Sequence, residues 1–323
     1  MTAARHAVRP RWTPLMPVLG LAFAGVAMGA AAACTSSWGV FGHERTKTSR
    51  LDIGAQPTLR IVGEVGDLQI VGSPDADRIR ALVRLVGRGD TADDAEARLN
   101  ELTGTLQRKG GVVLASTEHP EFTGPYPYAA YWSITAPVGT RVEVRNDVGD
   151  VVIYNTRAAV DVRNDVGDVW IAGVTDATVR VDVGDATVSA TGALDVAGDV
   201  GDVQAHTTAH ATSHSVTNDV GDVLVVLPTE WAGGFSTTVD TGSLTINGVT
   251  ERRAAATART AAPSSETPAR DAPPTLLART DVGDVTVLTT GDAGLLSPRP
   301  KLDVPDETKE NEGGAGSQGK AVD

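Results

Sequence analysis

The sequence has little cysteine, few aromatic residues and no excess of positive charge. It contains one cysteine, Cys34, so a disulfide framework and a cysteine-based zinc site are both excluded. The 28 Lys and Arg residues against 41 Asp and Glu leave a net charge of −13, without the basic excess that nucleic-acid binding requires. Aromatic residues are limited to five Trp, four Tyr and four Phe, against 35 Gly. A core in this chain must therefore be built from small aliphatic side chains.

The amino terminus has the layout of a secretory signal. Arg5, Arg9 and Arg11 precede an apolar run over 15–33 that carries no charge. Three alanines directly before Cys34 resemble the bacterial lipobox, although Ala31 stands where leucine is usual. We therefore expect residues 1–33 to be removed and Cys34 to carry lipid.

Two other fates of this segment stay open, an uncleaved membrane anchor and ordinary cleavage. An apolar run of about 19 residues is just long enough to cross a bilayer, so its length does not decide between them. All of these fates place the rest of the chain outside the cytoplasm, because the arginine cluster stays inside. The expected location is the extracytoplasmic face of the cell membrane, with a lipid anchor as the contact to the membrane.

A four-residue acidic box is repeated along the chain. Asp-Val-Gly-Asp occupies 147–150, 165–168, 182–185, 199–202, 219–222 and 281–284, with the variants Glu-Val-Gly-Asp at 64–67 and Asp-Thr-Gly-Ser at 240–243. From Gly149 to Gly242, successive box glycines lie 17 to 21 residues apart. One structural unit is therefore used eight times.

The residues around each box alternate between apolar and mixed positions, which is typical of a half-buried strand. The first and third positions after the boxes hold Val151 and Ile153, Val169 and Ile171, Ala186 and Val188, Val203 and Ala205, Val223 and Val225, Leu244 and Ile246, and Val285 and Val287. A second short strand precedes the boxes at Val142/Val144, Val160/Val162 and Val179/Val181. Two strands and two turns in each repeat fit one coil of a β-solenoid, whose coils stack about 4.8 Å apart.

The predicted fold is therefore mainly β, a single-chain, right-handed β-helix-like solenoid with an N-terminal strand and helix cap. The box glycine supplies the positive φ that the corner needs. Asn146, Asn164 and Asn218 precede three boxes at the same position and are expected to stack as a hydrogen-bonded ladder.

The segment before the continuous array has a different character. Strands are expected over 59–62, 68–71, 78–86, 112–117 and 128–136. A helix is expected over 90–106, capped by Asp90 and ending near Gly104. The expected organisation is a signal peptide at 1–33, a linker at 34–49, a cap region at 50–140, solenoid repeats at 141–250, a disordered insertion at 251–275, a final solenoid strand at 276–290 and a disordered tail at 291–323.

This ordered series resembles the "putative adhesin" domain family of bacterial envelope proteins, a domain of unknown function. The resemblance rests on the lipoprotein-like leader, the early Gly-Asp-strand unit at 66–70, the Arg-rich strand and acidic helix at 78–106, the strand-Pro-Val-Gly-Thr element at 131–140 and the repeated Gly-Asp-Val strands. It covers about residues 50–290 and implies a β-helix exposed outside the cell, with adhesion-like or envelope-stress roles. The insertion at 251–275 departs from the compact family pattern.

The boxes contain fifteen carboxylates, which account for almost all of the net charge of −16 that remains once Arg5, Arg9 and Arg11 are removed. Stacking places equivalent carboxylates about 5 Å apart, where like charges repel. Calcium would relieve this repulsion. The alternative is that each Asp accepts hydrogen bonds from turn amides and faces water. The calcium candidates are Asp147, Asp150, Asp165, Asp168, Asp182 and Asp185; no other metal, cofactor or catalytic residue is expected.

Three further patterns contain residue types that can carry chemistry. Paired box aspartates could serve as the acid and base of a polysaccharide-active β-helix enzyme, but a catalytic pair should be singular, and this pair recurs in every coil. His206, His210 and His214 are spaced by four and are expected in a solvated loop, with a weak metal site or a pH-sensitive patch as alternatives. The aromatic cluster of Tyr126, Tyr128, Tyr131 and Trp132 either fills the junction of cap and solenoid or binds sugars or peptides.

The sequence therefore predicts a non-enzymatic, lipid-anchored envelope protein. Its repetitive acidic surface would bind a cell-surface or cell-wall component through many similar weak contacts, so that avidity supplies the strength. The alternative is an envelope-stress or signalling accessory protein that binds a membrane protein or cell-wall fragment through its cap, and a polysaccharide-active β-helix enzyme is the third hypothesis.

Overall fold

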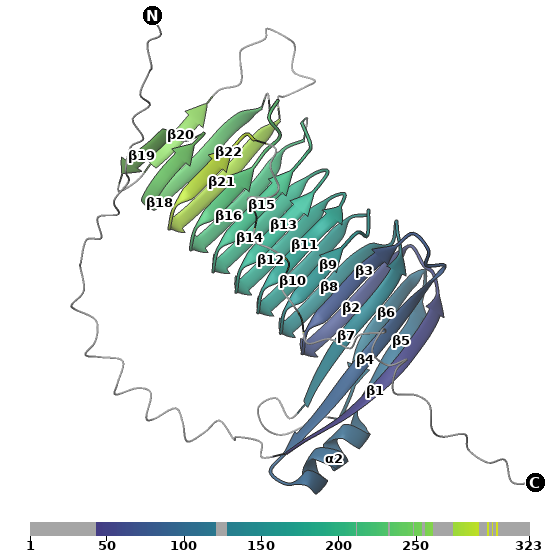
Figure 1. Cartoon of the computed structure of the whole chain (residues 1–323). Helices are drawn as coiled ribbons and strands as arrows, with labels where there is room; N and C mark the ends of the chain where they lie inside the picture. The colour runs from purple at the N-terminus through teal and green to yellow at the C-terminus, as the bar shows by residue number, and fades with distance from the viewer. Residues whose placement is uncertain are drawn as a thin grey trace, which may run out of the picture. The chain divides into compact units, whose positions relative to one another are not determined.

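The computed structural model of this chain describes residues 43–120, 128–210, 212–231, 233–247, 249–253, 256–260 and 274–290, together with Leu296, Arg299 and Leu302. The expected signal peptide, Cys34, Tyr126 and most of the expected tail lie outside these residues. The described part of the chain is mainly β, with one helix, α2, and strands β1 to β22 (Figure 1). No helix in this described part is long and apolar enough to cross a membrane.

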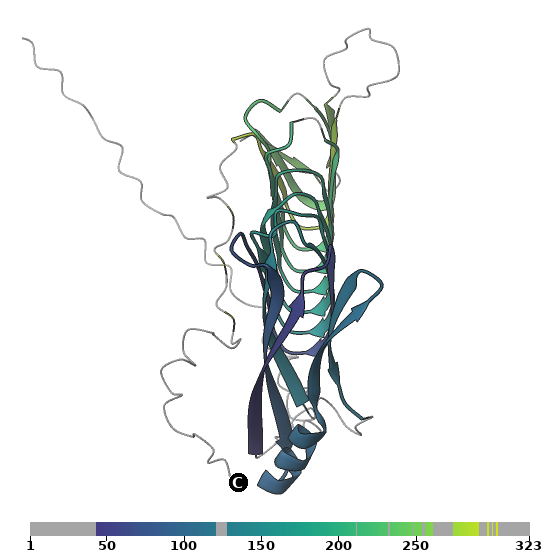
Figure 2. The ribbon, with the colours of Figure 1, turned by 90° about the vertical axis from the view of Figure 1, so that its right-hand side faces the viewer.

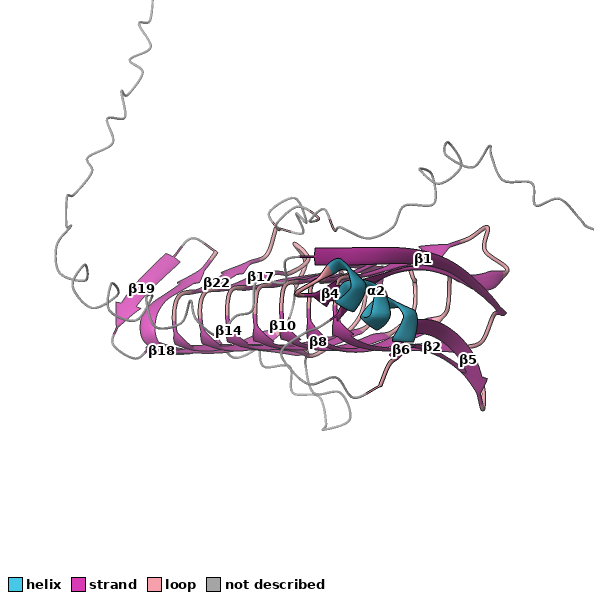
Figure 3. Cartoon of the chain, turned by 90° about the horizontal axis from the view of Figure 1, so that it is seen from below, coloured by secondary structure: helices cyan, strands magenta, loops and turns pink. Residues whose placement is uncertain are grey.

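The strands form two layers that face each other across one core (Figures 2 and 3). In spatial order, the first layer, sheet B, contains β5 (Thr103–Lys109), β6 (Val112–Glu118), β2 (Thr58–Val65), β8 (Arg141–Val148), β10 (Val160–Val166), β12 (Ala177–Val183), β14 (Leu194–Val200), β16 (His214–Val220), β21 (Thr275–Val282), β18 (Gly234–Ile246) and β20 (Ala256–Thr260).

The second layer, sheet A, contains, in the same spatial direction, β1 (His43–Gly54), β4 (Arg78–Gly89), β7 (Tyr128–Pro137), β3 (Leu68–Ser73), β9 (Val151–Tyr154), β11 (Val169–Val174), β13 (Ala186–Ala190), β15 (Val203–Thr207), β17 (Val223–Val226), β22 (Val285–Leu288), β18 again and β19 (Val249–Arg253). The central pairings are parallel, as one strand of each coil stacks on the same strand of the next. The predicted β-solenoid is confirmed.

The core consists of small aliphatic side chains from both layers. Val144, Val162 and Val179 point inward from sheet B, and Ile153 and Ile171 point inward from sheet A, each 0 or 1% exposed. Burying one such side chain stabilises the fold by about 1.5–3 kcal/mol. Thin layers of Val, Ile and Ala suffice because each coil packs on two neighbours.

At each corner the chain turns through the glycine of a box. Gly167 has φ +125°, a conformation that residues with a side chain rarely adopt. A Cβ there would lie 2.4 Å from the carbonyl oxygen of Gly149, the box glycine of the preceding coil. The glycine therefore serves both the turn and the close stacking of one coil on the next.

The last copy of the repeat is not the last coil in space. β21 pairs with β16 on one side and with β18 on the other, and β22 likewise lies between β17 and β18. The final solenoid strand thus joins the array, as predicted, but inside its end. β18 runs through both sheets and forms the outermost coil with the Asp-Thr-Gly-Ser box.

Strands occur in two segments that were not predicted to contain them: the linker, and the insertion, whose predicted disorder is corrected over 251–253 and 256–260. β19 and β20 begin the predicted disordered insertion at 251–275, where they pair antiparallel with β18 and cover the end of the array. β1 occupies the second half of the predicted linker at 34–49 and pairs antiparallel along β4. Its polar, largely exposed residues carry little of the alternation that identifies a buried strand.

The cap helix is shorter than predicted. α2 spans Ala92–Glu101, its N-cap is Thr91 rather than Asp90, and the Thr91 side chain accepts a hydrogen bond of 3.1 Å from the amide of Asp94. The helix ends at Leu102, and the residues that follow form β5. The helix packs on β4 and β1 (Figure 3). The expected helix to residue 106 is therefore wrong in its last turn.

One residue of the expected disordered tail is described against the solenoid. The guanidinium of Arg299 donates a hydrogen bond of 2.9 Å to Gln69 and lies 4.1 Å from the ring centroid of Tyr154. This contact is on the outer face of sheet A.

Candidate functional site

The boxes form one edge of the solenoid, which we call the corner. Their equivalent residues are in register through all eight levels, because the strands that lead into the boxes pair residue by residue. Three parallel rows result. The outer carboxylate row is Glu64, Asp147, Asp165, Asp182, Asp199, Asp219, Asp281 and Asp240; the valine row is Val65, Val148, Val166, Val183, Val200, Val220 and Val282, continued by Thr241; the inner carboxylate row is Asp67, Asp150, Asp168, Asp185, Asp202, Asp222 and Asp284, continued by Ser243.

The inner carboxylate row connects the coils. The Oδ1 atom of each Asp accepts a hydrogen bond from the backbone amide of the equivalent residue in the next coil. The donor–acceptor pairs are Asp150 to Asp67 (3.1 Å), Asp168 to Asp150 (2.9 Å), Asp185 to Asp168 (2.9 Å), Asp202 to Asp185 (2.8 Å), Asp222 to Asp202 (2.9 Å), Asp284 to Asp222 (2.8 Å) and Ser243 to Asp284 (2.8 Å). The predicted hydrogen bonds from turn amides to box carboxylates are thus present. They join successive coils, and their acceptors are the seven carboxylates of the inner row.

The end of this ladder explains the variant box at 240–243. An inner-row residue accepts from the next coil and donates to the previous one. Ser243 needs only to donate, because its coil is the outermost level of boxes. A carboxylate at position 243 would have no box amide in a further coil from which to accept a hydrogen bond.

The outer carboxylate row faces solvent. Asp165, Asp182 and Asp199 are exposed, and no hydrogen bond or ion pair of their side chains is recorded within the described chain. Burial, together with the charges of Asp165 and Glu64, raises the pKa of Asp147. Stacked like charges repel one another, so this row attracts cations.

Between the two carboxylate rows lies exposed apolar surface. Val166, Val183, Val200, Val220 and Val282 are 45–49% exposed, and they are stacked in register along the corner. Sequence reasoning missed this row, although the signal is present: seven of the eight boxes carry Val at a position that faces water in a turn. The corner is thus an apolar ridge with acid on both sides.

The structure places the calcium candidates in two different rows. Asp150, Asp168 and Asp185 accept amides from the following coil, whereas Asp147, Asp165 and Asp182 belong to the outer carboxylate row. The described residues contain no group of three or more His, Cys, Asp or Glu side chains placed to hold a metal ion. Burial and the charges of Asp67 and Asp168 raise the pKa of Asp150, and the amide of Asp168 opposes that shift.

The predicted asparagine ladder exists for one step. The side-chain amide of Asn146 donates to Asn164 Oδ1 at 3.0 Å, and both residues are buried. Val181 and Gly198 occupy the next two levels, so the ladder does not reach Asn218. Asn218 instead donates to the carbonyl oxygen of Gly201 at 2.6 Å.

The expectation of a solvated histidine loop is wrong for two of the three histidines. His206 lies in β15 and His214 in β16, and they are 4% and 3% exposed. They occupy different sheets, so the spacing by four does not gather them on one face. Nδ1 of His206 lies 2.9 Å from Ser189 Oγ, and Nδ1 of His214 accepts a hydrogen bond of 3.3 Å from the amide of Leu194.

The aromatic residues near the cap pack rather than line an open surface. Trp132 is fully buried and Tyr128 is 4% exposed, while Tyr131 stacks under the guanidinium of Arg84 at 4.1 Å. This arrangement supports the expectation that they fill the junction between cap and solenoid.

Tyr128 also joins a polar cluster that sequence reasoning did not find. Its hydroxyl donates to Glu64, and His119 Nε2 lies 3.0 and 3.1 Å from the two Glu64 oxygens. His119 Nδ1 lies 2.7 Å from the carbonyl oxygen of Pro120. Both ring nitrogens therefore face acceptors, which an imidazolium satisfies.

The pKa values of this cluster follow from its contacts. Burial disfavours the charged form of Glu64, but the hydrogen bonds from His119 and Tyr128 and the charge of His119 together lower the pKa of Glu64. Burial also opposes the charge of His119, yet its bonds to Glu64 and Pro120 raise its pKa. Burial and Glu64 raise the pKa of Tyr128, which stays a hydrogen-bond donor.

No family model matches this chain, and neither does any curated protein. Among solved structures, it is similar to a putative adhesin from Bacteroides fragilis, with 13% identity over 76% of this chain and 97% of that one and a TM-score of 0.38. It is also similar to a putative cell adhesion protein from Clostridium sporogenes (13%, 75% and 99%, 0.33) and a putative lipid binding protein from Parabacteroides distasonis (9%, 76% and 97%, 0.31). With identities of 13% or less and TM-scores below 0.5, these similarities assign no family, ligand or role to this chain.

Proposed function

We propose that this chain is a non-enzymatic envelope lipoprotein whose corner binds a cationic surface component. The observation that carries the proposal is the register of the three rows through eight levels. An exposed apolar ridge between two carboxylate rows matches a polymer or polypeptide that presents amines beside apolar groups. Each level offers one weak contact, and repetition along the corner supplies avidity.

The preferred occupant is not a second copy packed corner to corner. Two identical corners would bring carboxylate rows together, and like charges at short range repel. A cationic cell-wall or cell-surface component avoids this cost. Attraction between exposed charges weakens with salt, so binding should fall as ionic strength rises.

The test is co-sedimentation of the full-length protein with purified cell-wall material, using a triple variant of the outer carboxylate row, Asp165→Asn, Asp182→Asn and Asp199→Asn. These side chains make no recorded contact within the described chain, so the variant should fold normally. We expect binding to weaken at least tenfold. The matched control removes the same charge from α2 through Asp93→Asn, Glu96→Gln and Glu101→Gln, and it should bind like the wild type. Equal binding by the wild type and both variants would refute the proposal.

The ridge is tested separately. Val183→Thr and Val200→Thr keep the branched shape that suits a strand but replace a methyl group with a hydroxyl. If the valine row only stabilises the corner, the variant loses thermal stability, but the folded variant still binds cell-wall material as the wild type does. The proposal predicts the reverse.

The anchor is tested by the mass of the mature amino terminus. We propose that diacylglycerol is attached to Cys34, which would hold the solenoid at the outer face of the membrane. A Cys34→Ala variant should then leave the membrane fraction. An unmodified terminus, or one retaining residues 1–33, contradicts this part of the proposal while leaving the corner unaffected.

A further inference from the structure

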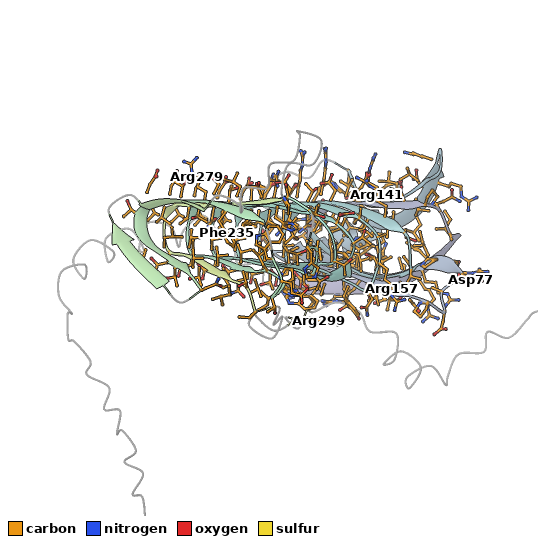
Figure 4. The ribbon with its side chains drawn as sticks, turned by 90° about the horizontal axis from the view of Figure 1, so that it is seen from above. Asp77, Arg141, Arg157, Phe235, Arg279 and Arg299 are labelled. Carbon is orange, nitrogen blue, oxygen red and sulfur yellow. The ribbon has the colours of Figure 1, made fainter. Side chains whose placement is uncertain are left out.

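A second charged feature lies on the outer face of sheet B, away from the corner. Arg145, Arg163 and Arg180 are register partners in three adjacent strands, β8, β10 and β12. Adjacent parallel strands lie about 4.8 Å apart, so the three guanidiniums leave the sheet as close neighbours. Figure 4 shows Arg141 and Arg279, from other parts of sheet B, on the same outer side of the molecule.

Only one of these three arginines is neutralised. Arg180 donates to Asp195 Oδ2 at 2.7 Å and to the carbonyl oxygens of Val179 and Asp195. Arg145 and Arg163 are exposed, and neither has a hydrogen bond or an ion pair within the described residues. In a chain with a net charge of −13, two adjacent cations without a partner are notable.

The acids around them do not supply the missing partner. Glu143 accepts from Arg60 at 2.7 and 2.8 Å, and it lies 3.3 Å from Arg141. Asp161 lies two residues before Arg163 on β10 and lines the same groove, but it forms no ion pair with Arg163 within the described residues. The two free guanidiniums therefore retain their donors for a ligand.

These side chains line a groove of about 430 Å³. Arg145 and Arg163 form one part of its wall, and Val62 and Leu114 form an apolar part beside them. Leu114 belongs to β6, which with β5 curves away from the plane of the solenoid (Figures 2 and 3). Val62 is 40% exposed. The groove thus combines two cations with apolar surface.

We propose that this groove binds a phosphoryl group, with Arg145 and Arg163 as its two ligands and the apolar part of the same molecule against Val62 and Leu114. Two guanidiniums offer several donors in a planar geometry that matches phosphate oxygens, and both stay charged at every physiological pH. A carboxylate is satisfied by one arginine, whereas a phosphoryl dianion takes two. Asp161 lies at the same site and limits affinity by repelling the anion.

The test uses the full-length protein and three probes: inorganic phosphate, glycerol phosphate, and vesicles of phosphatidylcholine with or without phosphatidic acid. Binding of the soluble probes is measured by calorimetry. The Arg145→Gln, Arg163→Gln double variant should bind them at least tenfold more weakly, and Asp161→Asn should bind them more tightly. The matched control is Arg180→Gln, whose guanidinium is held by Asp195, and it should differ from the wild type by less than twofold.

The vesicle arm identifies the source of the phosphoryl group. Loss of the phosphatidic acid dependence in the double variant, with weak binding of soluble phosphate, assigns the groove to a lipid headgroup. If instead the double variant loses its binding of the soluble probes, the groove is assigned to a free phosphate ester. Equal binding of all probes by the wild type and the double variant overturns the proposal, as does the absence of saturable binding. Because both arginines are exposed and unpaired, the variant should melt at the wild-type temperature, so a folding defect is readily recognised. Failure here leaves the corner proposal standing.

Discussion

The carboxylate of Asp150 accepts a hydrogen bond of 2.9 Å from the backbone amide of Asp168, one coil further along the solenoid. The same contact recurs from Asp67 to Ser243, so one acidic side chain in seven of the eight boxes fastens two coils together. The acid on the neighbouring outer row makes no such contact. A sequence motif with two equivalent-looking aspartates thus has one structural member and one surface member.

Replacing Asp150 by alanine should therefore destabilise the protein, whereas replacing Asp147 in the same box should not. The first change leaves the Asp168 amide without its acceptor, at a cost of about 1.5–3 kcal/mol, which is reduced by relief of the burial and of the charges of Asp67 and Asp168 that raise the pKa of Asp150. The second removes an exposed carboxylate whose pKa is raised by burial and by its neighbours Asp165 and Glu64, so removal relieves unfavourable charge. Urea unfolding of both variants measures the difference. Equal effects would contradict the division into two rows.

Gly184→Ala should be strongly destabilising. Gly184 has φ +141°, and an added Cβ would lie 2.2 Å from the carbonyl oxygen of Gly167. Backbone strain of this kind alone costs about 1–3 kcal/mol, and the contact with the preceding coil adds to it. Gly139→Ala is the control, because Gly139 also has positive φ (+88°) but no atom within 4 Å of the added carbon. The excess loss of stability at Gly184, read from thermal unfolding, measures the stacking constraint.

The cluster around Glu64 predicts a stability term that is lost in alkaline solution. The folded pKa of His119 is raised, so its contribution is complete below its unfolded pKa of 6.5 and disappears as pH rises through the folded value. The lowered pKa of Glu64 adds stability above its unfolded pKa of 4.5, which is lost as pH falls through its folded value. Between these limits the pair is fully formed.

A His119→Gln variant measures this contribution. Its deficit relative to the wild type should be largest near pH about 5.5 and should shrink near pH about 8.5. Denaturant unfolding at the two pH values gives the comparison. A deficit that is the same at both would show that His119 acts by packing on Tyr128 and not by its charge.

His214 predicts the opposite dependence. Burial lowers its pKa, opposed by a backbone contact at Ala209, and the neutral ring accepts from the amide of Leu194. The unfolded chain therefore binds the proton more readily, and stability should fall as pH drops below the unfolded pKa of 6.5.

Replacing His214 by glutamine, which keeps an acceptor for Leu194, should remove this acid sensitivity. The nearby and exposed His210→Gln is the control and should retain the wild-type profile. Melting temperatures between pH about 5 and 7.5 provide the measurement. A His214→Gln profile as steep as the wild type would locate the sensitivity elsewhere.

Much of the solenoid was predictable because its determinants are local. Alternation places Val169 and Ile171 inward within any strand, and Gly167 is required wherever the chain turns with positive φ. The repeat then implies stacking, since a single coil cannot bury its own apolar face. The exposure of the box valine could have been predicted by the same reasoning, because an apolar residue that recurs at one turn position lies outside the core.

The misplaced elements are those whose identity depends on distant partners. β1 is a polar strand that exists because β4 offers it an edge, and β5 follows α2 at once because its residues pair with β6. A one-dimensional pattern contains no sign of either partner. The burial of His206 and His214 has the same origin, since neighbouring coils and Trp231 enclose side chains that local polarity assigns to water.

The sequence by itself determined the repeated coil, its aliphatic interior and its glycine corner, because each depends on residues close together in the chain. Only the tertiary structure decided that the last copy enters between β17 and β18, that Ser243 ends the ladder of amides, and that Arg180 is paired while Arg145 and Arg163 are free. These outcomes depend on which coil lies next to which, and that order is settled by pairing across loops rather than by local preference.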